Sequence, residues 1–422
     1  DLVRSRGLGD VYKRQKKHFL FASVLALLCG SSTLHAQDFK LTSSGYFKNQ
    51  GVDVMAFDDI YPEGHQGGVC IIMNGHRVAT NGDIRLEATP GQWQPVPKQL
   101  DRKLGDNSIT ATLCYPDSSR HLTGFNPMIY PDLHLIYTVN VESKGKNIEV
   151  TVDLDRPIPQ EFIGKVGFNL EFFPGSLFGK PWIMDGQSGI FPQQPNSPLM
   201  TTQPNYLHTG NYHDGKQSLA DMDKLIGKGY SPIVADDIIS EPYAKGRKFT
   251  SRPDDPYNKV TIESLSGDLQ LFDGRMNHNN GWFVLRSNIK PGVTKGAVKW
   301  IITPNVVADW MYQPVIQTSQ IGYHPAQDKE AVIEMDIRDN RKETAQIIRI
   351  DADGEKVVKN VTPANWGKFL RYNYLKVDFT DVKEPGLYKI KYDTSVSPIF
   401  RIDNDVYARG VWQPVLEYFL PV

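Results

Sequence analysis

One group of acidic residues near the N-terminal third of the chain has the residue types needed for acid–base chemistry or for calcium binding. Asp58 and Asp59 are adjacent, and Asp53, Glu63 and His65 lie close to them in the sequence. Paired carboxylates can serve as general acid and general base, and carboxylate oxygens are ligands that Ca²⁺ prefers. Carboxylates gathered in a loop are, however, more often a solvated surface or a hydrogen-bonded turn. We therefore predict no catalytic residue and no cofactor, and calcium has no further support in the sequence.

Two short motifs resemble catalytic sequences but are better explained as turns. Residues 186–190 read Gly-Gln-Ser-Gly-Ile, which departs from a nucleophile elbow at the last position and lacks the strand-to-helix context. Residues 351–354 read Asp-Ala-Asp-Gly between two predicted strands, where Asp-Gly favours a hairpin turn. The two cysteines after residue 36, Cys70 and Cys114, lack metal-site spacing, so no metal ligand is predicted.

Carbohydrate binding is the chemistry that the aromatic and polar residues favour most. Sugar rings present C–H faces that pack on aromatic side chains, while amide and charged groups bond their hydroxyls. Trp282 follows a polar segment that contains Arg275 and Asn279, and Trp182 lies near acidic and amide residues. We predict sugar contacts for these four residues, with Trp93 and Trp366 less favoured. The alternative is that the large aromatic side chains belong to a hydrophobic core.

The elements that would position these residues are short strands, so the predicted fold class is all-β. Residues 37–312 contain apolar runs bounded by turn signals such as Asn74-Gly75 and Asn81-Gly82, which predicts a large β-sandwich. Residues 313–403 contain seven shorter runs, as expected of an immunoglobulin-like sandwich. In the run 387–392, Tyr388, Ile390 and Tyr392 should point inward. Short helices are expected over residues 219–226 and at the C-terminus.

The N-terminal segment is expected to contribute nothing to this fold. Residues 1–15 are interpreted as a leading segment that is not native to the protein. Residues 16–36 have the positive, apolar and small-residue regions of a signal peptide. We therefore predict a secreted or periplasmic protein without a transmembrane segment. With 47 Lys and Arg against 48 Asp and Glu, the net charge is -1, and no basic block is long enough to track a phosphate backbone. Nucleic acid is not an expected partner.

Segments of residues 313–403 resemble a known domain. Gln317-Thr-Ser-Gln-Ile-Gly-Tyr-His-Pro325, followed by Pro385-Gly-Leu-Tyr388 and then Phe400-Arg-Ile-Asp-Asn-Asp-Val-Tyr407, is similar to the N-terminal immunoglobulin-like domain of cellulases. In family 9 glycoside hydrolases that domain precedes a helical-barrel catalytic domain. The resemblance implies that the chain is the N-terminal part of such an enzyme, acting on β-glucan-type polysaccharides.

The end of the chain fits this resemblance. After Asp403 the apolar period changes to near four, and residues 404–422 resemble the first helix of the family's barrel, capped at Asn404 or Asp405 and kinked at Pro414. The family's catalytic Asp and Glu motifs do not occur here, which predicts a truncated, non-catalytic portion whose immunoglobulin-like domain buttresses the missing barrel. Two alternatives stay open. The helix could instead cap the second sandwich, and the large β-sandwich could be a carbohydrate-binding module.

Overall fold

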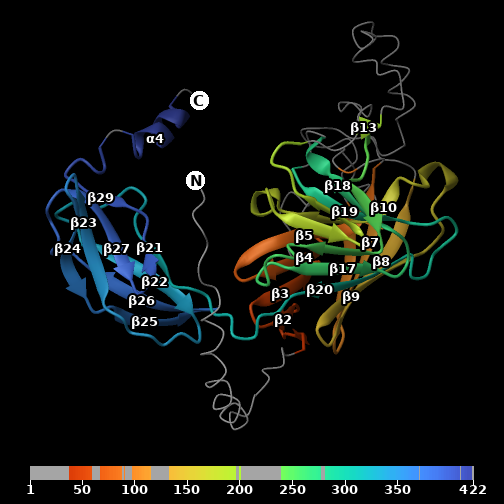
Figure 1. The fold of residues 1–422 in the computed structure, drawn as a ribbon, viewed down its shortest axis with the longest axis horizontal. Helices are drawn as coiled ribbons and strands as arrows, with labels where there is room; N and C mark the ends of the chain where they lie inside the picture. The colour runs from red at the N-terminus through yellow and green to blue at the C-terminus, as the bar shows by residue number, and fades with distance from the viewer. Residues whose placement is uncertain are drawn as a thin grey trace, which may run out of the picture.

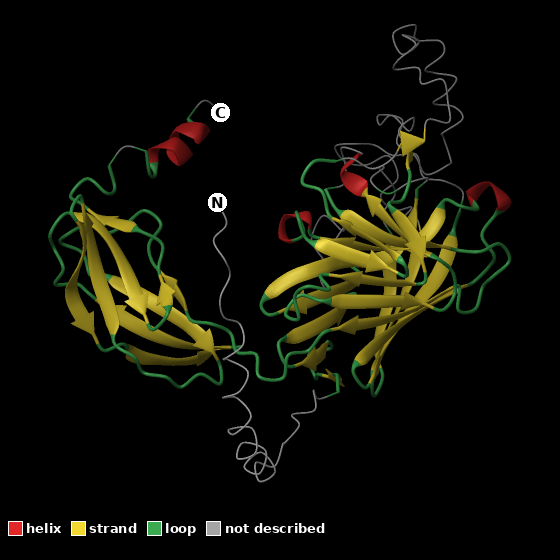
Figure 2. Cartoon of the chain, in the orientation of Figure 1, coloured by secondary structure: helices red, strands yellow, loops and turns green. Residues whose placement is uncertain are grey.

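The computed structural model describes residues 38–58, 67–87, 90, 97–115, 133–195, 199–200, 239–276, 281–369, 371–408 and 410–420. Within these ranges the chain is built almost entirely of antiparallel strands, and α4 (Gln413–Phe419) is a short helix near the C-terminus. Figure 2 shows the strands gathered into two β-sheet bodies, with α4 beyond the second. The predicted all-β class with a short C-terminal helix is confirmed. The predicted lead and signal peptide, 1–36, and the predicted helix at 219–226 lie outside the described residues.

Two nine-stranded sheets form the first body (Figure 1). The first sheet runs in the order β1 (Lys40–Leu41), β2 (Phe47–Asn49), β3 (Val52–Ala56), β4 (Val69–Met73), β5 (His76–Leu86), β10 (Val166–Phe172), β19 (Phe283–Asn288), β18 (Leu269–Asp273) and β15 (Ala244–Gly246). The second runs in the order β12 (Gln187–Ile190), β11 (Pro181–Met184), β16 (Lys248–Ser251), β17 (Val260–Ser264), β20 (Val298–Pro304), β9 (Asn147–Leu154), β8 (Leu135–Lys144), β7 (Ser108–Tyr115) and β6 (Lys98–Leu104). A separate pair joins β13 (Leu199–Met200) to β14 (Ile239–Ser240).

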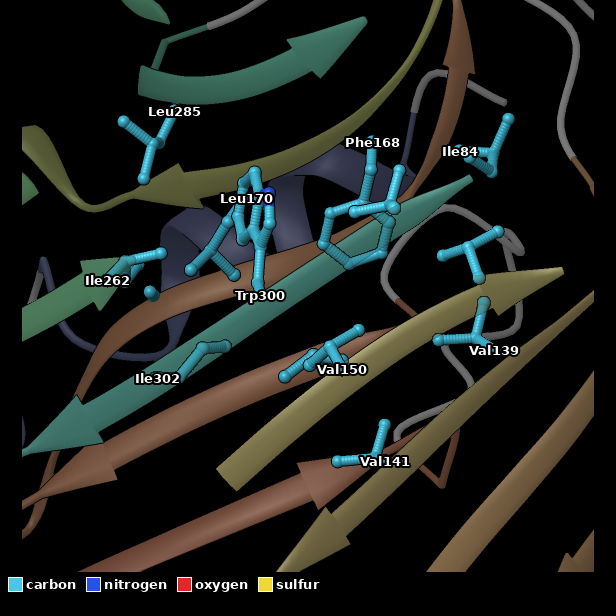
Figure 3. Close-up of a cluster of buried hydrophobic side chains, with 14 of the residues drawn as sticks. Ile84, Val139, Val141, Val150, Phe168, Leu170, Ile262, Leu285, Trp300 and Ile302 are labelled. Carbon is cyan, nitrogen blue, oxygen red and sulfur yellow. The ribbon is translucent and has the colours of Figure 1, made fainter. Parts of the chain in front are cut away.

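The core of the first body lies between these two sheets because apolar residues alternate along the strands that face it. In β9 every second residue from Ile148 to Leu154 is buried, as expected of a strand with one face on the core. Trp300 of β20 meets Phe168 of β10 edge to face, with ring centroids 5.0 Å apart. Figure 3 shows Trp300 among the aliphatic side chains of both sheets. Its indole N–H donates to Ser287 Oγ at 3.0 Å, so the buried ring leaves no N–H unsatisfied.

A four-stranded and a five-stranded sheet form the second body. The first has the order β21 (Val315–Gln317), β22 (Glu330–Asp336), β26 (Tyr372–Asp378) and β25 (Ala364–Phe369). The second has the order β24 (Gly354–Val361), β23 (Ala345–Asp351), β27 (Gly386–Tyr392) and β28 (Ser395–Val396), and β29 (Phe400–Ile402) also pairs with β27. The predicted inward residues Tyr388, Ile390 and Tyr392 are all buried. The two sheets enclose a hydrophobic cluster of their own.

The two Asn-Gly sequences that predicted turns adopt different structures. Asn74 and Gly75 both have positive φ and form the two-residue turn between β4 and β5, as predicted. Asn81 and Gly82, in contrast, lie inside β5, where Asn81 has a φ of 55° and the pairing with both neighbouring strands shifts register. The predicted turn is therefore a β-bulge in the middle of a sheet, because a left-handed residue can also absorb one extra residue within a strand.

The connection between the two bodies is held by polar contacts to Trp310. Its carbonyl oxygen accepts hydrogen bonds from Gln50 Nε2 of the first body and from Arg338 Nη2 of the second, both at 2.7 Å. An ion pair links Arg371 Nη1 to Asp53 Oδ2 at 3.3 Å. Gln50 of the β2–β3 turn is thus joined through Trp310 to the residues after β22, and Asp53 of β3 is joined to the residue before β26.

Candidate functional site

The Gln-Ile-Gly-Tyr-His-Pro segment crosses the end of the second body and pairs with the chain as it leaves β29. Gly322 has a φ of 103°, and a Cβ at this position would overlap the backbone oxygen of Arg401. The Tyr323 N–H donates to Arg401 O at 2.9 Å, and the Asp403 N–H donates to Tyr323 O at 3.0 Å. Glycine is required here because only it combines this backbone conformation with so close an approach.

Tyr323 anchors the same segment in the core. Its ring is buried and meets Phe379 and Phe400 edge to face, at 5.1 and 5.3 Å between centroids. Its hydroxyl donates to Glu330 O at 2.9 Å and accepts the Ser319 N–H at 3.0 Å. The tyrosine therefore satisfies two backbone groups that would otherwise be left without partners in a half-buried turn.

The polar residues that follow Tyr323 have structural partners rather than catalytic geometry. Gln327 Oε1 accepts the His324 N–H and the Tyr407 O–H, both at 2.7 Å. Lys329 Nζ donates to Pro325 O at 2.9 Å and to Gln327 O at 3.0 Å. Burial, followed by the charge of a neighbouring lysine, lowers the pKa of Lys329. The segment thus ties the turn after β21 to the start of the C-terminal stretch.

Helix α4 begins later than predicted and leaves its apolar side chains exposed. Its first residue is Gln413, with Pro414 in the first turn, so Pro414 begins the helix instead of kinking it. Proline is tolerated there because the first-turn N–H groups have no intrahelical acceptor. Leu416 is 51% exposed and Phe419 64% exposed. Neither predicted cap, Asn404 or Asp405, adjoins the helix.

The residues predicted to contact sugar lie in different surroundings. Trp182 of β11 is 6% exposed and lies against Gly189 of the neighbouring strand β12, which leaves little of its ring open. Trp282 is half-buried, and its ring meets Phe173 edge to face at 4.5 Å. Asn279 lies outside the described residues. Trp182 lies in the second nine-stranded sheet, whereas Trp282 directly precedes β19 of the first, and their sugar contacts stay predictions.

Arg275 holds a turn together. Its guanidinium bonds both Asp273 carboxylate oxygens at 2.8 Å and donates to the carbonyl oxygens of Pro192 and Gln193, also at 2.8 Å. The same group lies over the ring of Phe283, 4.5 Å from its centroid. The Gly274 N–H donates to Trp282 O, so Arg275 and Trp282 are brought into one turn.

The other motifs considered in the sequence have structural explanations. Residues 351–354 form the hairpin turn between β23 and β24, as predicted, and residues 186–190 form a hairpin with β11. Asp53 pairs with Arg371, and burial raises its pKa. Asp58 lies 3.9 Å from Arg102, whereas Asp59 and its predicted companions at 63 and 65 lie outside the described residues. Across the described ranges, no group of three His, Cys, Asp or Glu side chains has the geometry of a metal site.

A buried charged cluster on β5, β10 and β19 was not predicted. Arg286 Nη1 bonds Glu87 Oε1 at 3.0 Å, and the exposed fractions of the two side chains are 2% and 1%. Asn169 Nδ2 donates to the same Glu87 oxygen at 2.6 Å, and Arg286 Nη2 donates to the carbonyl oxygen of Lys165 at 2.7 Å. These bonds join three neighbouring strands.

The cluster continues along β5. Tyr137 donates its hydroxyl to Asp83 Oδ1 at 2.8 Å, and Arg85 lies 3.7 Å from the other oxygen of Asp83. Asn81 Nδ2 donates to Glu171 Oε2 at 2.6 Å. Residues 81, 83, 85 and 87 alternate with apolar residues, which is typical of a half-exposed strand, so the sequence carried a polar signal but gave no reason to expect its burial.

Burial shifts the ionisation of this cluster. Desolvation, only partly offset by Arg286 and Asn169, raises the pKa of Glu87 to about 7. Desolvation likewise raises the pKa of Asp83 to about 6, against the opposing effects of Arg85 and the Tyr137 hydroxyl. Removing a carboxylate from water disfavours its charged form, and here that cost exceeds the attraction of the arginines.

Comparison with known proteins identifies part of the second body. Residues 311–397 match the family model of the cellulase N-terminal Ig-like domain. No curated protein matches the chain. No helix in the described ranges is both long enough and apolar enough to span a bilayer.

Two solved structures resemble parts of the chain. The structure of a Bacteroides ovatus GH9 is 26% identical over 22% of this chain, with a TM-score of 0.18, and the match spans only 16% of that protein. The structure of HI1317 is 7% identical over 63% of this chain and 98% of its own length, with a TM-score of 0.26. Both TM-scores are too low to support an argument about function, so the family match of residues 311–397 is the comparison that bears on function.

Proposed function

We propose that the chain is a non-catalytic N-terminal portion of a secreted family 9 glycoside hydrolase, and that its second sandwich supports a helical catalytic barrel acting on β-glucan-type polysaccharides. In this proposal residues 37–312 and 313–403 are the two structural units, and 404–422 are the first helix of the barrel, which packs against the rest of it. The match of residues 311–397 to the cellulase N-terminal Ig-like domain carries the proposal.

The surface of α4 supports a packing role for the C-terminal stretch. Leu416, Tyr418 and Phe419 lie on one short helix and are each more than half exposed. Adjacent large apolar side chains in water usually mark a contact surface. The Gln-Ile-Gly-Tyr-His-Pro segment fixes where this stretch leaves the sandwich, through the bond from the Tyr407 hydroxyl to Gln327.

The support role is tested with a family 9 catalytic barrel prepared without its own immunoglobulin-like domain. The full chain is added, and the unfolding temperature and glucan hydrolysis of the barrel are measured. We expect both to rise, and we expect Leu416→Ser with Phe419→Ser to remove the gain. Leu265→Ser, at an equally exposed leucine of the first body, is the matched control. An unchanged barrel in the presence of the full chain contradicts the proposal.

A second candidate function is glycan binding by the first body. It is supported by the turn in which Arg275 and the half-buried Trp282 adjoin each other. Affinity electrophoresis of the full chain through soluble glucans tests it. Retardation that is lost in Trp282→Ala supports this site, whereas equal mobility of the two proteins on every polymer excludes it.

A further inference from the structure

Five aromatic side chains, two in the connection between the bodies and three in the second body, touch one another in series, and we call them the aromatic row. Trp310 meets Tyr312 at 6.4 Å between ring centroids, Tyr312 meets Tyr372 at 5.1 Å, Tyr372 meets Tyr374 at 6.1 Å, and Tyr374 meets Trp366 at 5.6 Å. Neighbouring rings are tilted by 52° to 89°. The row runs from the connection between the bodies to strand β25, along the sheet that Figure 1 labels β22, β26 and β25.

Strand geometry places the row on the outer face of its sheet. In β26, Tyr372 and Tyr374 alternate with the buried residues Asn373 and Leu375, so the two tyrosines point away from the core. A register shift in β25 between residues 365 and 367 inserts Trp366 as an extra residue beside Tyr374. Bulges near edges commonly redirect a side chain, and here the bulge brings the indole to the end of the row.

The row is open to solvent at its β25 end. Trp366 is 58% exposed, and Phe369, two residues past the bulge on the same edge strand, is 57% exposed. Tyr372 and Tyr374 are half-buried. At the opposite end the first body covers the row, since a Cβ at Gly51 would lie 2.8 Å from the Trp310 ring. Neighbouring exposed aromatic side chains on an edge strand commonly mark an interaction site.

Hydrogen-bonding groups accompany the rings. Tyr312 donates its hydroxyl to Glu334 Oε1 at 3.0 Å. Lys376, the next outward residue of β26, pairs with Glu330 at 2.7 Å. Burial and the Glu334 carboxylate raise the pKa of Tyr312 and Tyr374 above its ordinary value.

We propose that the aromatic row is a binding platform for a neutral β-linked glucan chain, which stacks on Trp366 and Phe369 and bonds the tyrosine hydroxyls and Glu334. A sugar chain offers what this surface lacks, namely C–H faces for the rings together with hydroxyls that both donate and accept. The choice of glucan rests on the proposed function; the existence of a platform rests on the row.

The composition of the row favours a glycan over a protein partner. Its open members are aromatic, and charged residues stand directly beside them, including Lys376 and Arg371. Val315 of β21, opposite Glu334, is 37% exposed on the same face, whereas more exposed aliphatic side chains lie elsewhere, for example Leu416 on α4 and Val357 on β24. A contact surface for a protein is therefore available that does not use the row.

The test is affinity electrophoresis of the full chain through hydroxyethylcellulose, barley β-glucan and, as a non-β-linked control, dextran. We expect retardation by the two β-glucans and a roughly tenfold weaker affinity for Trp366→Ala, because one stacking aromatic is removed. Phe369→Ala should weaken binding less. Trp412→Ala is the matched control, since Trp412 is equally exposed but lies outside the row, and it should leave affinity unchanged. Thermal unfolding of each variant shows that the second body stays folded.

The possible results separate this inference from the functions proposed above. Equal retardation of the parent chain, Trp366→Ala and Phe369→Ala overturns the platform, as does mobility that no glucan changes. Loss of retardation in Trp282→Ala alone assigns binding to the first body and also overturns it. If a catalytic barrel shields Trp366 from solvent and the chain binds no glucan, the row is a contact surface for a protein and not a glucan platform. Support of the barrel is measured by its unfolding temperature and the platform by glucan affinity, so either proposal can fail without the other.

Discussion

Arg286 and Glu87 form a buried ion pair between residues 199 positions apart in the sequence, with 3.0 Å between Nη1 and Oε1. Asn169 lies on β10 between their strands and bonds Glu87 as well. The pair therefore fastens three adjacent strands of the first body through polar groups rather than through apolar packing. Each residue stabilises the other, because either one alone would be a buried charge without a counter-charge.

Arg286→Met should destabilise the first body by about 3–5 kcal/mol, since it leaves the Glu87 carboxylate buried without its cation. Lys295→Met removes the exposed Lys295–Asp153 pair instead and should cost less than about 1 kcal/mol. Urea unfolding followed by hydrogen exchange in β5, β10 and β19 measures the first body alone. Equal losses in the two variants would show that the buried pair contributes no more than a surface pair.

The stability of the first body should decrease as the pH rises from about 4.5 to about 7. The folded pKa of Glu87, about 7, lies above its ordinary value of 4.5, so the folded state binds more protons within this window. The free energy of unfolding therefore falls as the pH rises, in total by on the order of 1–3 kcal/mol. The pKa of Asp83 is raised from its ordinary 3.8 to about 6, so Asp83 lowers the stability in the same direction between these two pH values.

Glu87→Gln is the variant that isolates this effect. Glutamine cannot ionise, so the unfolding temperature should change less between pH 5 and pH 8 than it does in the parent chain. Asp254→Asn, at a carboxyl whose pKa is lowered by Arg252 on the surface, serves as the comparison and should leave the slope above pH 5 unchanged. A parent chain that becomes more stable toward pH 8 would contradict the assigned sign.

Gly322→Ala should destabilise the second body by about 2–4 kcal/mol, because the added methyl group meets the Arg401 carbonyl while φ stays positive. Gly354→Ala is the control. Gly354 also has a positive φ, 127°, but a Cβ there meets nothing within 4 Å, so only the cost of backbone strain, about 1 kcal/mol, applies. Calorimetric unfolding of both variants compares them, and equal losses would rule out the steric contribution.

Strand positions could be predicted where one face is buried and the other is open. In β27 the alternation of aromatic or aliphatic residues with lysines gives both the strand and the inward face, and the structure agrees. Strand β25 could not be predicted, because almost all of its residues are exposed and it includes a glycine and a bulge. Without a buried face there is no period in the sequence to detect.

Candidate binding residues were harder to predict than strands. Trp182 and Trp366 look alike in sequence, and Trp182 was favoured because polar residues accompany it. The structure buries Trp182 against Gly189 and leaves Trp366 open at the end of the aromatic row. The contacts of Trp366 come from residues brought beside it by strand pairing, and a single sequence does not show such pairing. The charged cluster around Glu87 was missed for the same reason.

The exposed apolar residues of α4 should contribute nothing to the stability of the second body. We expect Leu416→Ser with Phe419→Ser to change its free energy of unfolding by less than about 0.5 kcal/mol and to reduce binding of a hydrophobic dye, because both side chains face water. Val406→Ala is the contrasting variant. Val406 is fully buried beside Gly322, so losing its methyl groups should cost about 1–3 kcal/mol. Calorimetric unfolding compares the two, and if the serine variant lost as much stability as Val406→Ala, α4 would pack on the sandwich as a cap and would not be available to a catalytic barrel.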